Sequence, residues 1–342
     1  MSDRSPRRLA RSPYVFVVGC PRSGTTLLQR MLDAHPRLAI ANDTHFIPRA
    51  VQAVTPSVWL EPARARWLTQ HEALVSWARS YHRFERLGLD EVCVNRAARR
   101  SGSYADFVSR LYREFAAARG KELGGEKTPD YVRCLPLLHE LFPDVQSVHI
   151  VRDGRDVALS TLEWARETKG PARFDLWREE PVAVCALWWR WQVGSGRRDG
   201  AKVRAGSYLE VSYERLVRDP AATLHEVADF LGLADAKEML SFNAGKERLD
   251  PSLSAKRAWR SPTPGLRDWR TQMDERSIEL FEALAGDLLG ELGYPRAFPG
   301  ISSSIARVAL RSYAWWEEEL QRRDAKLRAT VGIAEATAQR GG

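Results

Sequence analysis

The chain carries two patterns of hydrophobic and polar positions. Some short runs are continuously β-branched or aromatic, which is typical of strands buried on both faces of a parallel sheet. Longer stretches repeat apolar residues at helical spacing. Strands are predicted over Tyr14–Val18, Leu38–Ile40, Ser147–Val151 and Ser207–Val211. Helices are predicted over Leu27–Ala34, Pro62–Gly88, Ser103–Arg119, Arg155–Glu167, Pro181–Arg198, Pro220–Leu231 and Met273–Leu292.

The alternation of strands and helices predicts an α/β fold. We expect a P-loop-like, three-layer parallel sheet flanked by helices, forming a single domain over residues 14–298. A basic N-terminal arm (1–13) precedes it, and a helical tail (299–342) follows it. The tail is predicted to dock on its own domain or on a partner, for example in a homodimer. Residues 245–268 lack periodicity and read as a long loop, which in a compact domain often serves as a lid.

Composition narrows the class of protein. Of 342 residues, 44% are hydrophobic and 28% are charged, which is typical of a globular chain. No apolar run approaches the roughly 18 residues of a membrane span. The basic N-terminus lacks the apolar segment of a secretory signal, so we expect a cytoplasmic protein. The four cysteines are far apart, without CxxC, and should be thiols. Without a metal-ligand cluster, no metal is expected.

The charge balance adds little by itself. The net charge is +8, and Arg supplies 44 of the 52 basic residues. This bias reflects either genome composition or an attraction for anionic ligands. The basic residues are dispersed and no nucleic-acid recognition motif stands out, so a nucleic-acid-binding module is a remote alternative and no nucleic-acid partner is expected.

The strongest local motif is the segment Gly19-Cys-Pro-Arg-Ser-Gly-Thr-Thr26, between the first strand and a helix. A strand–turn–helix exposes backbone N–H groups at the positive end of the helix dipole, where phosphate or sulfate oxygens bind. Gly24 permits close approach of the anion. Ser23, Thr25 and Thr26 can donate hydroxyl hydrogen bonds, and Arg22 offers a guanidinium fork.

This loop departs from the P-loop pattern GxxxxGK[ST] in one position. Thr25 stands where the lysine is expected, and the cation comes earlier, at Arg22. The lysine bridges the β- and γ-phosphates in nucleoside triphosphatases. The sequence therefore favours anion binding over ATP hydrolysis, and a small-molecule P-loop kinase using ATP and Mg²⁺ remains the alternative function.

A second basic cluster, VRDGRDVALS, follows the strand Ser147–Val151 directly. In parallel α/β sheets, ligands bind at the carboxyl ends of strands. Arg152 and Ser160 can share one face and bind a second phosphate. Asp153 and Asp156 cap the helix or orient the arginines.

Four segments carry a family resemblance, and they occur in the order VGCPRSGTTLLQRMLDAHP, EKTPDYV, VRDGRDVALS and YLEVSYERLVRDP. They resemble the sulfotransferases that use 3′-phosphoadenosine 5′-phosphosulfate (PAPS), over about residues 14–295. The first segment and DTHFIPR (43–49) are most similar to the protein-tyrosine sulfotransferase branch and its bacterial relatives. That branch also carries Arg in the first loop.

The resemblance implies roles for the site residues. The loop Arg22–Thr26 would hold the 5′-phosphosulfate, and Arg152 with Ser160 would hold the 3′-phosphate. Lys127 matches a family lysine that contacts the transferring group. The remaining nucleotide contacts implied are Tyr213 and, in the late nucleotide-covering segment, Arg267.

The resemblance also implies a base and a reaction. A sulfuryl group passes from PAPS to an acceptor hydroxyl or amine, without a metal. Asp43 falls where the tyrosine-sulfating relatives carry a glutamate base, and His45 is a rival because a histidine pKa suits neutral pH. An N-cap role for Asp43 is the structural alternative. The acceptor is expected to be a small hydroxylated metabolite or a glycan rather than a protein tyrosine.

Overall fold

The centre of the molecule is a five-stranded sheet, seen in a computed structural model that describes residues 13–54, 71–165, 173–244, 262, 263 and 265–340. The strands are β1 (Val15–Gly19), β2 (Leu38–Asn42), β3 (Leu123–Lys127), β4 (Gln146–Val151) and β5 (Tyr208–Ser212). They pair in the order β2-β3-β1-β4-β5, and every pair is parallel. The expected α/β fold is therefore present.

Strand β1 occupies the middle because its residues Val15, Phe16, Val17 and Val18 are fully buried, and only a central strand has both faces covered. After β1, the chain first adds β2 and β3 on one side of it and then crosses over to add β4 and β5 on the other side. Such a reversal at a central strand opens a crevice at its carboxyl end. The loop after β1 lies at that crevice.

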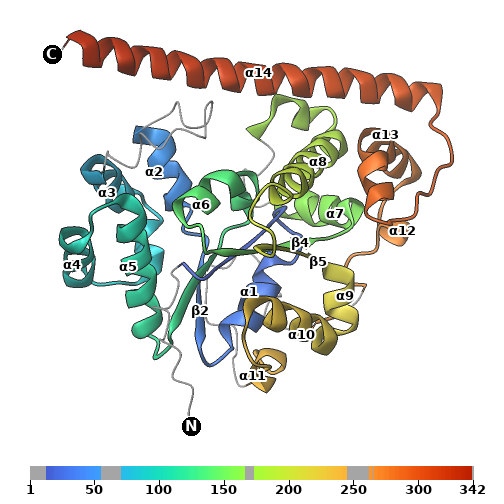
Figure 1. Cartoon of the computed structure of the whole chain (residues 1–342). Coiled ribbons are helices and arrows are strands. Elements are labelled where there is room, and N and C mark those ends of the chain that lie inside the picture. Colours follow the sequence, from blue (N-terminus) through green and yellow to red (C-terminus); the bar gives the residue numbers. More distant parts are fainter. Residues whose placement is uncertain (1–12, 55–70, 166–172, 245–261, 264, 341–342) are drawn as a thin grey trace.

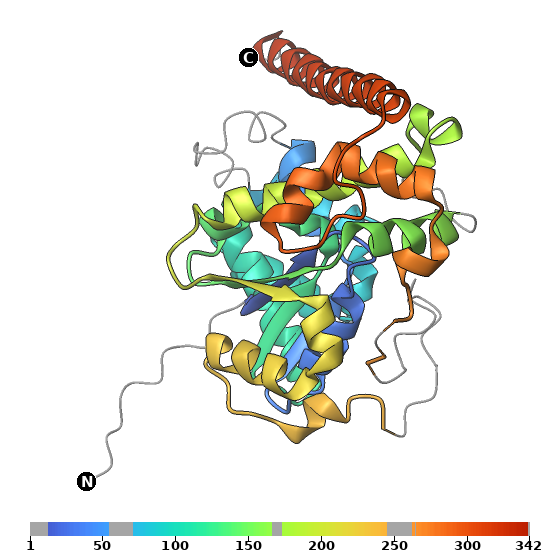
Figure 2. The same cartoon turned by 90° about the vertical axis from the view of Figure 1, so that its right-hand side faces the viewer.

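Helices cover both faces of the sheet. Figures 1 and 2 show α1 and α10 on one face, and α5, α6 and α8 on the other. Alternate residues of β1 belong to the two cores: Val15 and Val17 pack with α1 and α10, whereas Phe16 and Val18 pack with α5 and α6. A third apolar cluster joins α7, α8 and α13. These layers fix the strand ends rigidly.

The helices run as follows: α1 (Thr25–Asp33), α2 (Phe46–Val54), α3 (His71–Ser80), α4 (Glu91–Arg100), α5 (Tyr104–Ala117), α6 (Leu135–Leu141), α7 (Gly154–Ala165), α8 (Pro181–Gly200), α9 (Tyr213–Arg218), α10 (Pro220–Leu231), α11 (Lys237–Leu240), α12 (Trp269–Gln272), α13 (Glu275–Glu291) and α14 (Ser303–Arg340). For the helix predicted over Pro62–Gly88, residues 62–70 lie outside the described residues, α3 confirms His71–Ser80, and the prediction is wrong beyond Ser80, because Phe84–Leu87 is a 3₁₀ turn. The loop predicted over 245–268 lies mostly outside the described residues.

One strand, β3, was not predicted from the sequence. Its residues, Leu-Gly-Gly-Glu-Lys, show neither an apolar run nor an alternation. The glycines are there for space: a Cβ on Gly124 would lie 2.1 Å from the Tyr112 carbonyl oxygen of α5, and one on Gly125 would lie 2.6 Å from the Val15 carbonyl oxygen. Close approach of two backbones, rather than strand propensity, selects this sequence.

The tail is helix α14, which lies across the top of the molecule in Figure 1, above α8. Ile305, Ala309 and Trp316 are buried in the cluster that contains α8 and α13. The apolar positions of the tail thus pack on its own domain, as one of the two expectations had it. Within the described part of the chain, no helix has the length and apolarity to cross a membrane.

Candidate functional site

The predicted site residues lie in one row at the carboxyl edge of the sheet. Because all five strands are parallel, their carboxyl ends meet at the same edge. Along the strand order, the row reads Asp43 and His45 after β2, Lys127 at the end of β3, Arg22–Thr26 after β1, Arg152 after β4 and Tyr213 after β5. Segments as far apart in sequence as Arg22 and Tyr213 thereby form one site.

The first loop leaves the start of α1 open. Its N-cap is Gly24, with a left-handed φ of 94°, and no side chain caps the helix. Ser23 is fully buried, and its Oγ has no hydrogen-bond partner in the structure. The Arg22 Nε donates to the Ser160 Oγ on α7, at 3.1 Å. The loop therefore presents a buried, unpartnered hydroxyl beside a helix start that no side chain caps.

Tyr213 joins the two basic clusters. Its ring lies so close to Gly24 that a Cβ there would be 2.4 Å from Cδ2. On its other side, the Arg152 guanidinium carbon lies 4.3 Å from the ring centroid. The first loop, α7 and the start of α9 therefore meet around one aromatic ring.

Arg152 is 6% exposed and pairs through Nη2 with Asp156 Oδ2 at 3.3 Å. Its Nε is buried without a hydrogen-bond partner. Asp156 also accepts from the Trp269 backbone N–H, at 3.0 Å. Burial raises the pKa of Asp156, and the Arg152 charge opposes that rise. The segment before α13 is thereby tied to the second basic cluster.

Arg267 lies in that same segment, and its side chain contacts α7. It pairs with Glu163, one turn beyond Ser160 on the helix. Asp153 does not simply cap α7: it binds the buried Arg155 through two oxygens, at 3.0 and 2.7 Å. The two predicted roles of Asp153, helix capping and arginine orientation, are both present, since Oδ1 also accepts the Arg155 N–H.

Asp43, Lys127 and His45 form a compact group at the other end of the row. Lys127 is 1% exposed, and its Nζ lies 3.1 Å from Asp43 Oδ2. The second oxygen, Asp43 Oδ1, is buried without a hydrogen-bond partner and lies 3.9 Å from His45 Nε2. Burial lowers the pKa of His45 to about 4, so this imidazole is neutral at pH 7. The group holds one cation and one carboxylate with a free acceptor atom.

Backbone strain gathers at the same residues. Among the described residues, the non-glycine residues with left-handed φ are Arg22 (77°), Asp43 (52°) and His45 (58°). Such conformations cost about 1–3 kcal/mol each and persist where the surroundings enforce them, often at functional sites. All three residues are among the site residues predicted from the sequence.

Glu126 is a site residue that the sequence analysis missed. It is fully buried and accepts hydrogen bonds from the Thr44 N–H at 3.0 Å and from the hydroxyls of Thr44, Thr128 and Tyr112. Burial raises its pKa, and these hydrogen bonds oppose the rise. Glu126 thus fixes the turn that carries Asp43 and His45. Its position beside Lys127 was the only sequence signal.

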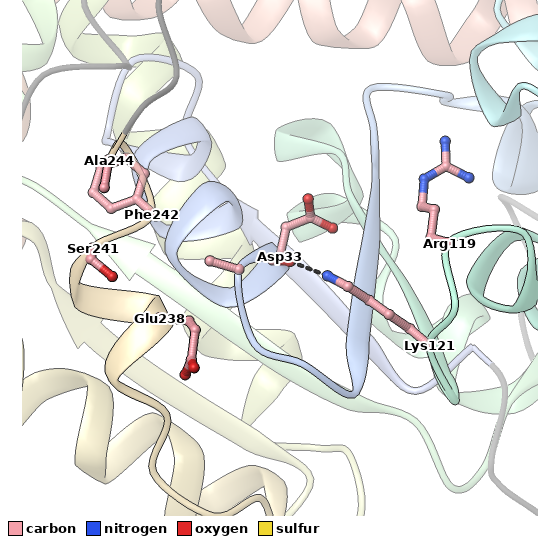
Figure 3. A pocket seen from close by; sticks show the side chains of 8 residues that line it. Asp33, Arg119, Lys121, Glu238, Ser241, Phe242 and Ala244 are labelled. Carbon is pink, nitrogen blue, oxygen red and sulfur yellow. Dashed lines mark hydrogen bonds between the residues drawn. The ribbon is translucent and has the colours of Figure 1, made fainter.

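The described residues also form a cavity of about 490 Å³ elsewhere, shown in Figure 3. It lies beside Asp33 at the far end of α1, where Lys121 Nζ donates to the Asp33 and Leu38 carbonyl oxygens. None of the predicted site residues lines it. The carboxyl edge of the sheet remains the candidate site.

A parallel sheet with a strand–loop–helix unit at its central strand defines a P-loop-like fold class. The model of the Sulfotransferase family matches residues 13–237. The chain belongs to that family.

The chain is also similar to individual proteins of known name. Protein-tyrosine sulfotransferase A of Caenorhabditis elegans is 26% identical over 224 residues, covering 65% of this chain and 50% of the relative. Nodulation protein NoeE of Sinorhizobium fredii is 28% identical over 299 residues, covering 82% of this chain and 66% of the relative. The chain spans about half the length of the first curated relatives that it matches. Among solved structures, the sulfotransferase domain of the Synechococcus PCC 7002 olefin synthase has 24% identity and a TM-score of 0.47, covering 81% of this chain and 96% of that one.

Proposed function

We propose that this enzyme transfers a sulfuryl group from PAPS to an acceptor hydroxyl. The observation that carries the proposal is the row of anion-binding and proton-accepting groups along one sheet edge, with Asp43 at one end and Arg152 beyond the first loop. PAPS carries anionic groups at two separated positions, the 5′-phosphosulfate and the 3′-phosphate. Two cationic clusters joined by Tyr213 suit such a molecule.

Buried polar atoms without partners support the fit of the donor. The Ser23 Oγ and the Arg152 Nε are both buried and lack hydrogen-bond partners in the structure. A buried unsatisfied donor costs free energy, which an anionic oxygen would recover. On this proposal Arg22–Thr26 would hold the 5′-phosphosulfate, while Arg152, Ser160 and Arg267 would hold the 3′-phosphate side, with Tyr213 against the nucleotide.

The bound donor supplies the sulfuryl group, and adenosine 3′,5′-bisphosphate is the leaving group. The acceptor oxygen forms the new S–O bond as the bond between sulfur and the phosphate oxygen breaks. Arg22 and the N–H groups of α1 would stabilise the charge that grows on the leaving phosphate. The positive charge of Lys127 would stabilise the sulfuryl oxygens. Its Nζ is buried and lies 3.1 Å from its counterion Asp43.

Asp43 would accept the proton of the acceptor hydroxyl. Its Oδ1 is buried and lacks a hydrogen-bond partner, so it has an unused lone pair near Lys127. His45 is the weaker candidate, because Asp43 rather than His45 contacts Lys127, and burial lowers the His45 pKa to about 4, which removes the advantage of an ordinary histidine as a base at pH 7. The acceptor we propose is a small hydroxylated metabolite or a glycan, in the cytoplasm.

Two measurements test this function. Thermal unfolding should shift upward with adenosine 3′,5′-bisphosphate and much less with adenosine 5′-monophosphate, which lacks the 3′-phosphate. An Arg152→Gln variant should lose that difference. Turnover should then require PAPS and persist in EDTA; turnover that needs ATP and Mg²⁺ would instead establish the kinase alternative.

A further inference from the structure

The tail helix α14 reaches toward the candidate site. It lies outside residues 13–237, which the family model covers. In Figure 1 it crosses above α8. Its Trp316 ring packs at centroid distances of 5.2 Å from Phe174 and 5.8 Å from Trp191 of α8. Further along α14, the Arg323 guanidinium carbon lies 4.5 Å from the Phe174 ring centroid.

A chain of contacts leads from this aromatic cluster to the proposed base. The Arg133 guanidinium lies 4.4 Å from the Trp191 ring centroid, and its Nη2 lies 3.4 Å from Asp130 Oδ1. Asp130 Oδ2 lies 4.0 Å from His45 Nδ1. The other nitrogen of His45 lies 3.9 Å from Asp43 Oδ1. The aromatic cluster is therefore continuous with the place where the acceptor hydroxyl must lie.

This region holds more cations than carboxylates. Arg173 lies 5.4 Å from the Phe174 centroid and 5.3 Å from the Trp188 centroid. Burial lowers its pKa, and the charges of Arg323, Arg133 and Arg49 lower it further, while Asp130 opposes them. Arg173 and Arg323 both contact the Phe174 ring, and Arg173 and Arg133 both contact the Trp188 ring, so the three guanidinium groups lie close together.

Two carboxylates partly balance these arginines. Burial alone would raise the pKa of Asp130, but Arg133, His45 and Arg173 bring it below its usual range. Glu319 of α14 is shared between Arg322 and Arg323, at 3.1 and 2.6 Å.

Two buried atoms at this place have no hydrogen-bond partner. They are the Arg133 Nε and the Oε1 of Gln192, a fully buried residue whose Nε2 donates to Asp130 Oδ1 at 3.0 Å. Guanidinium groups that stack on aromatic rings keep their N–H edges available for bidentate binding of an oxyanion. The arrangement thus offers an apolar surface with cationic donors.

We propose that Arg133, Arg173 and Arg323 form an acceptor subsite that binds an anionic group of a small acceptor, and that α14 is one of its walls. The class is a hydroxylated molecule that also carries a carboxylate or a sulfate. This inference rests on the proposed sulfotransferase function. It adds that the tail helix determines which acceptor is chosen.

The test uses a ladder of ω-(4-hydroxyphenyl)alkanoates with one to five methylene groups, each paired with its neutral amide. With PAPS as donor, the acid should exceed its amide in kcat/KM by about tenfold at the best chain length, the value of one charged hydrogen bond. Arg323→Gln should remove most of this preference. Arg311→Gln on the exposed side of α14 deletes the same charge and should keep it.

Two results would overturn the subsite. Acids and amides could react equally at every length, or the two arginine variants could behave alike. Failure of the enzyme function looks different, because then neither acid nor amide reacts. In that case calorimetric titration of each probe into the complex with adenosine 3′,5′-bisphosphate still decides: equal binding of acid and amide contradicts the subsite, and tighter binding of the acid supports it.

Discussion

Lys127 Nζ lies 3.1 Å from Asp43 Oδ2, at the carboxyl ends of the neighbouring strands β2 and β3. The backbone holds the pair too, because the Asp43 N–H donates to the Lys127 carbonyl oxygen at 2.7 Å. One carboxylate oxygen thus faces a buried cation, and the other, Oδ1, has no hydrogen-bond partner. A proton acceptor beside a stabiliser of negative charge is the pairing that sulfuryl transfer to a hydroxyl requires.

Replacing Asp43 should separate catalysis from donor binding. Asp43→Asn should lower kcat by about 10²–10⁴-fold, the scale of losing a general base. Binding of adenosine 3′,5′-bisphosphate should survive, since the residues proposed to bind its phosphates follow other strands. Single-turnover kinetics and a binding titration measure the two effects. His45→Asn is the matched variant and should cost much less; a larger loss there, with Asp43→Asn near wild type, would make His45 the base.

Glu126 should prove to be a positioning residue. Glu126→Gln keeps the shape but turns one acceptor oxygen into a donor, which then faces either the Thr44 hydroxyl at Oε1 or the Tyr112 hydroxyl at Oε2. Displacement of the Asp43 turn should lower kcat about 10- to 100-fold, because small misplacements of reacting groups are costly. The dissociation constant of adenosine 3′,5′-bisphosphate should stay within about twofold, since that site forms on other strands.

The control for this prediction is Glu122→Gln, the same change at an exposed carboxylate just before β3. It should leave kcat unchanged. Equal losses of kcat and nucleotide affinity in Glu126→Gln would indicate general destabilisation and would refute the positioning role.

Local sequence was enough to predict most strands and the loops that follow β1 and β4. Val15–Val18 is apolar because both of its faces are covered, and the glycine-bearing turn after it has few other structural uses. Strand β3 was not predicted, because its glycines Gly124 and Gly125 are required by close contact with the backbones of α5 and β1, which are distant in sequence. Strand propensity reflects only residues that are close together along the chain, so it carries no information about such distant contacts.

The missed part of the site has the same origin. The role of Glu126 depends on Tyr112 from α5 and Thr44 from the turn after β2, which only the tertiary fold brings together. The burial of Lys127 likewise depends on β3 being an interior strand, which the sequence did not predict.

Gly24 should tolerate no side chain. In Gly24→Ala the new Cβ would lie 2.4 Å from the Tyr213 ring, and the residue would also keep a left-handed φ of 94°. The ring would have to move away from Gly24, which disturbs its contact with Arg152. We expect at least a tenfold loss of affinity for adenosine 3′,5′-bisphosphate in a binding titration, the equivalent of about 1.4 kcal/mol.

Gly206→Ala supplies the control, because Gly206 has a similar φ of 75° and no atom within 4 Å of its Cβ position. This variant has the left-handed backbone strain, which costs about 1 kcal/mol, but no clash. Its melting temperature should fall, and its nucleotide affinity should not. A matching affinity loss in both variants would show that strain alone, not the Tyr213 contact, explains Gly24→Ala.

Stability should fall in mild acid because histidines are buried in neutral form. Burial lowers the pKa of His149 to about 3, and those of His139 and His45 to about 4. Unfolded histidine has a pKa of about 6.5. Between pH 6.5 and 4 the unfolded chain therefore binds protons that the folded chain does not. The free energy of unfolding should drop by about 1.4 kcal/mol per pH unit for each such histidine.

Denaturant unfolding at several pH values tests this through His149, which is fully buried and bonds through Nδ1 to the Tyr208 hydroxyl at 2.6 Å. In His149→Asn the slope between pH 6.5 and 4 should decrease by about 1.4 kcal/mol per pH unit. Tyr208→Phe removes the hydrogen-bond partner but leaves the imidazole buried, so it should keep the slope despite lower stability. An unchanged slope in His149→Asn would mean that His149 takes up its proton without unfolding, and that the sheet beside β5 admits water.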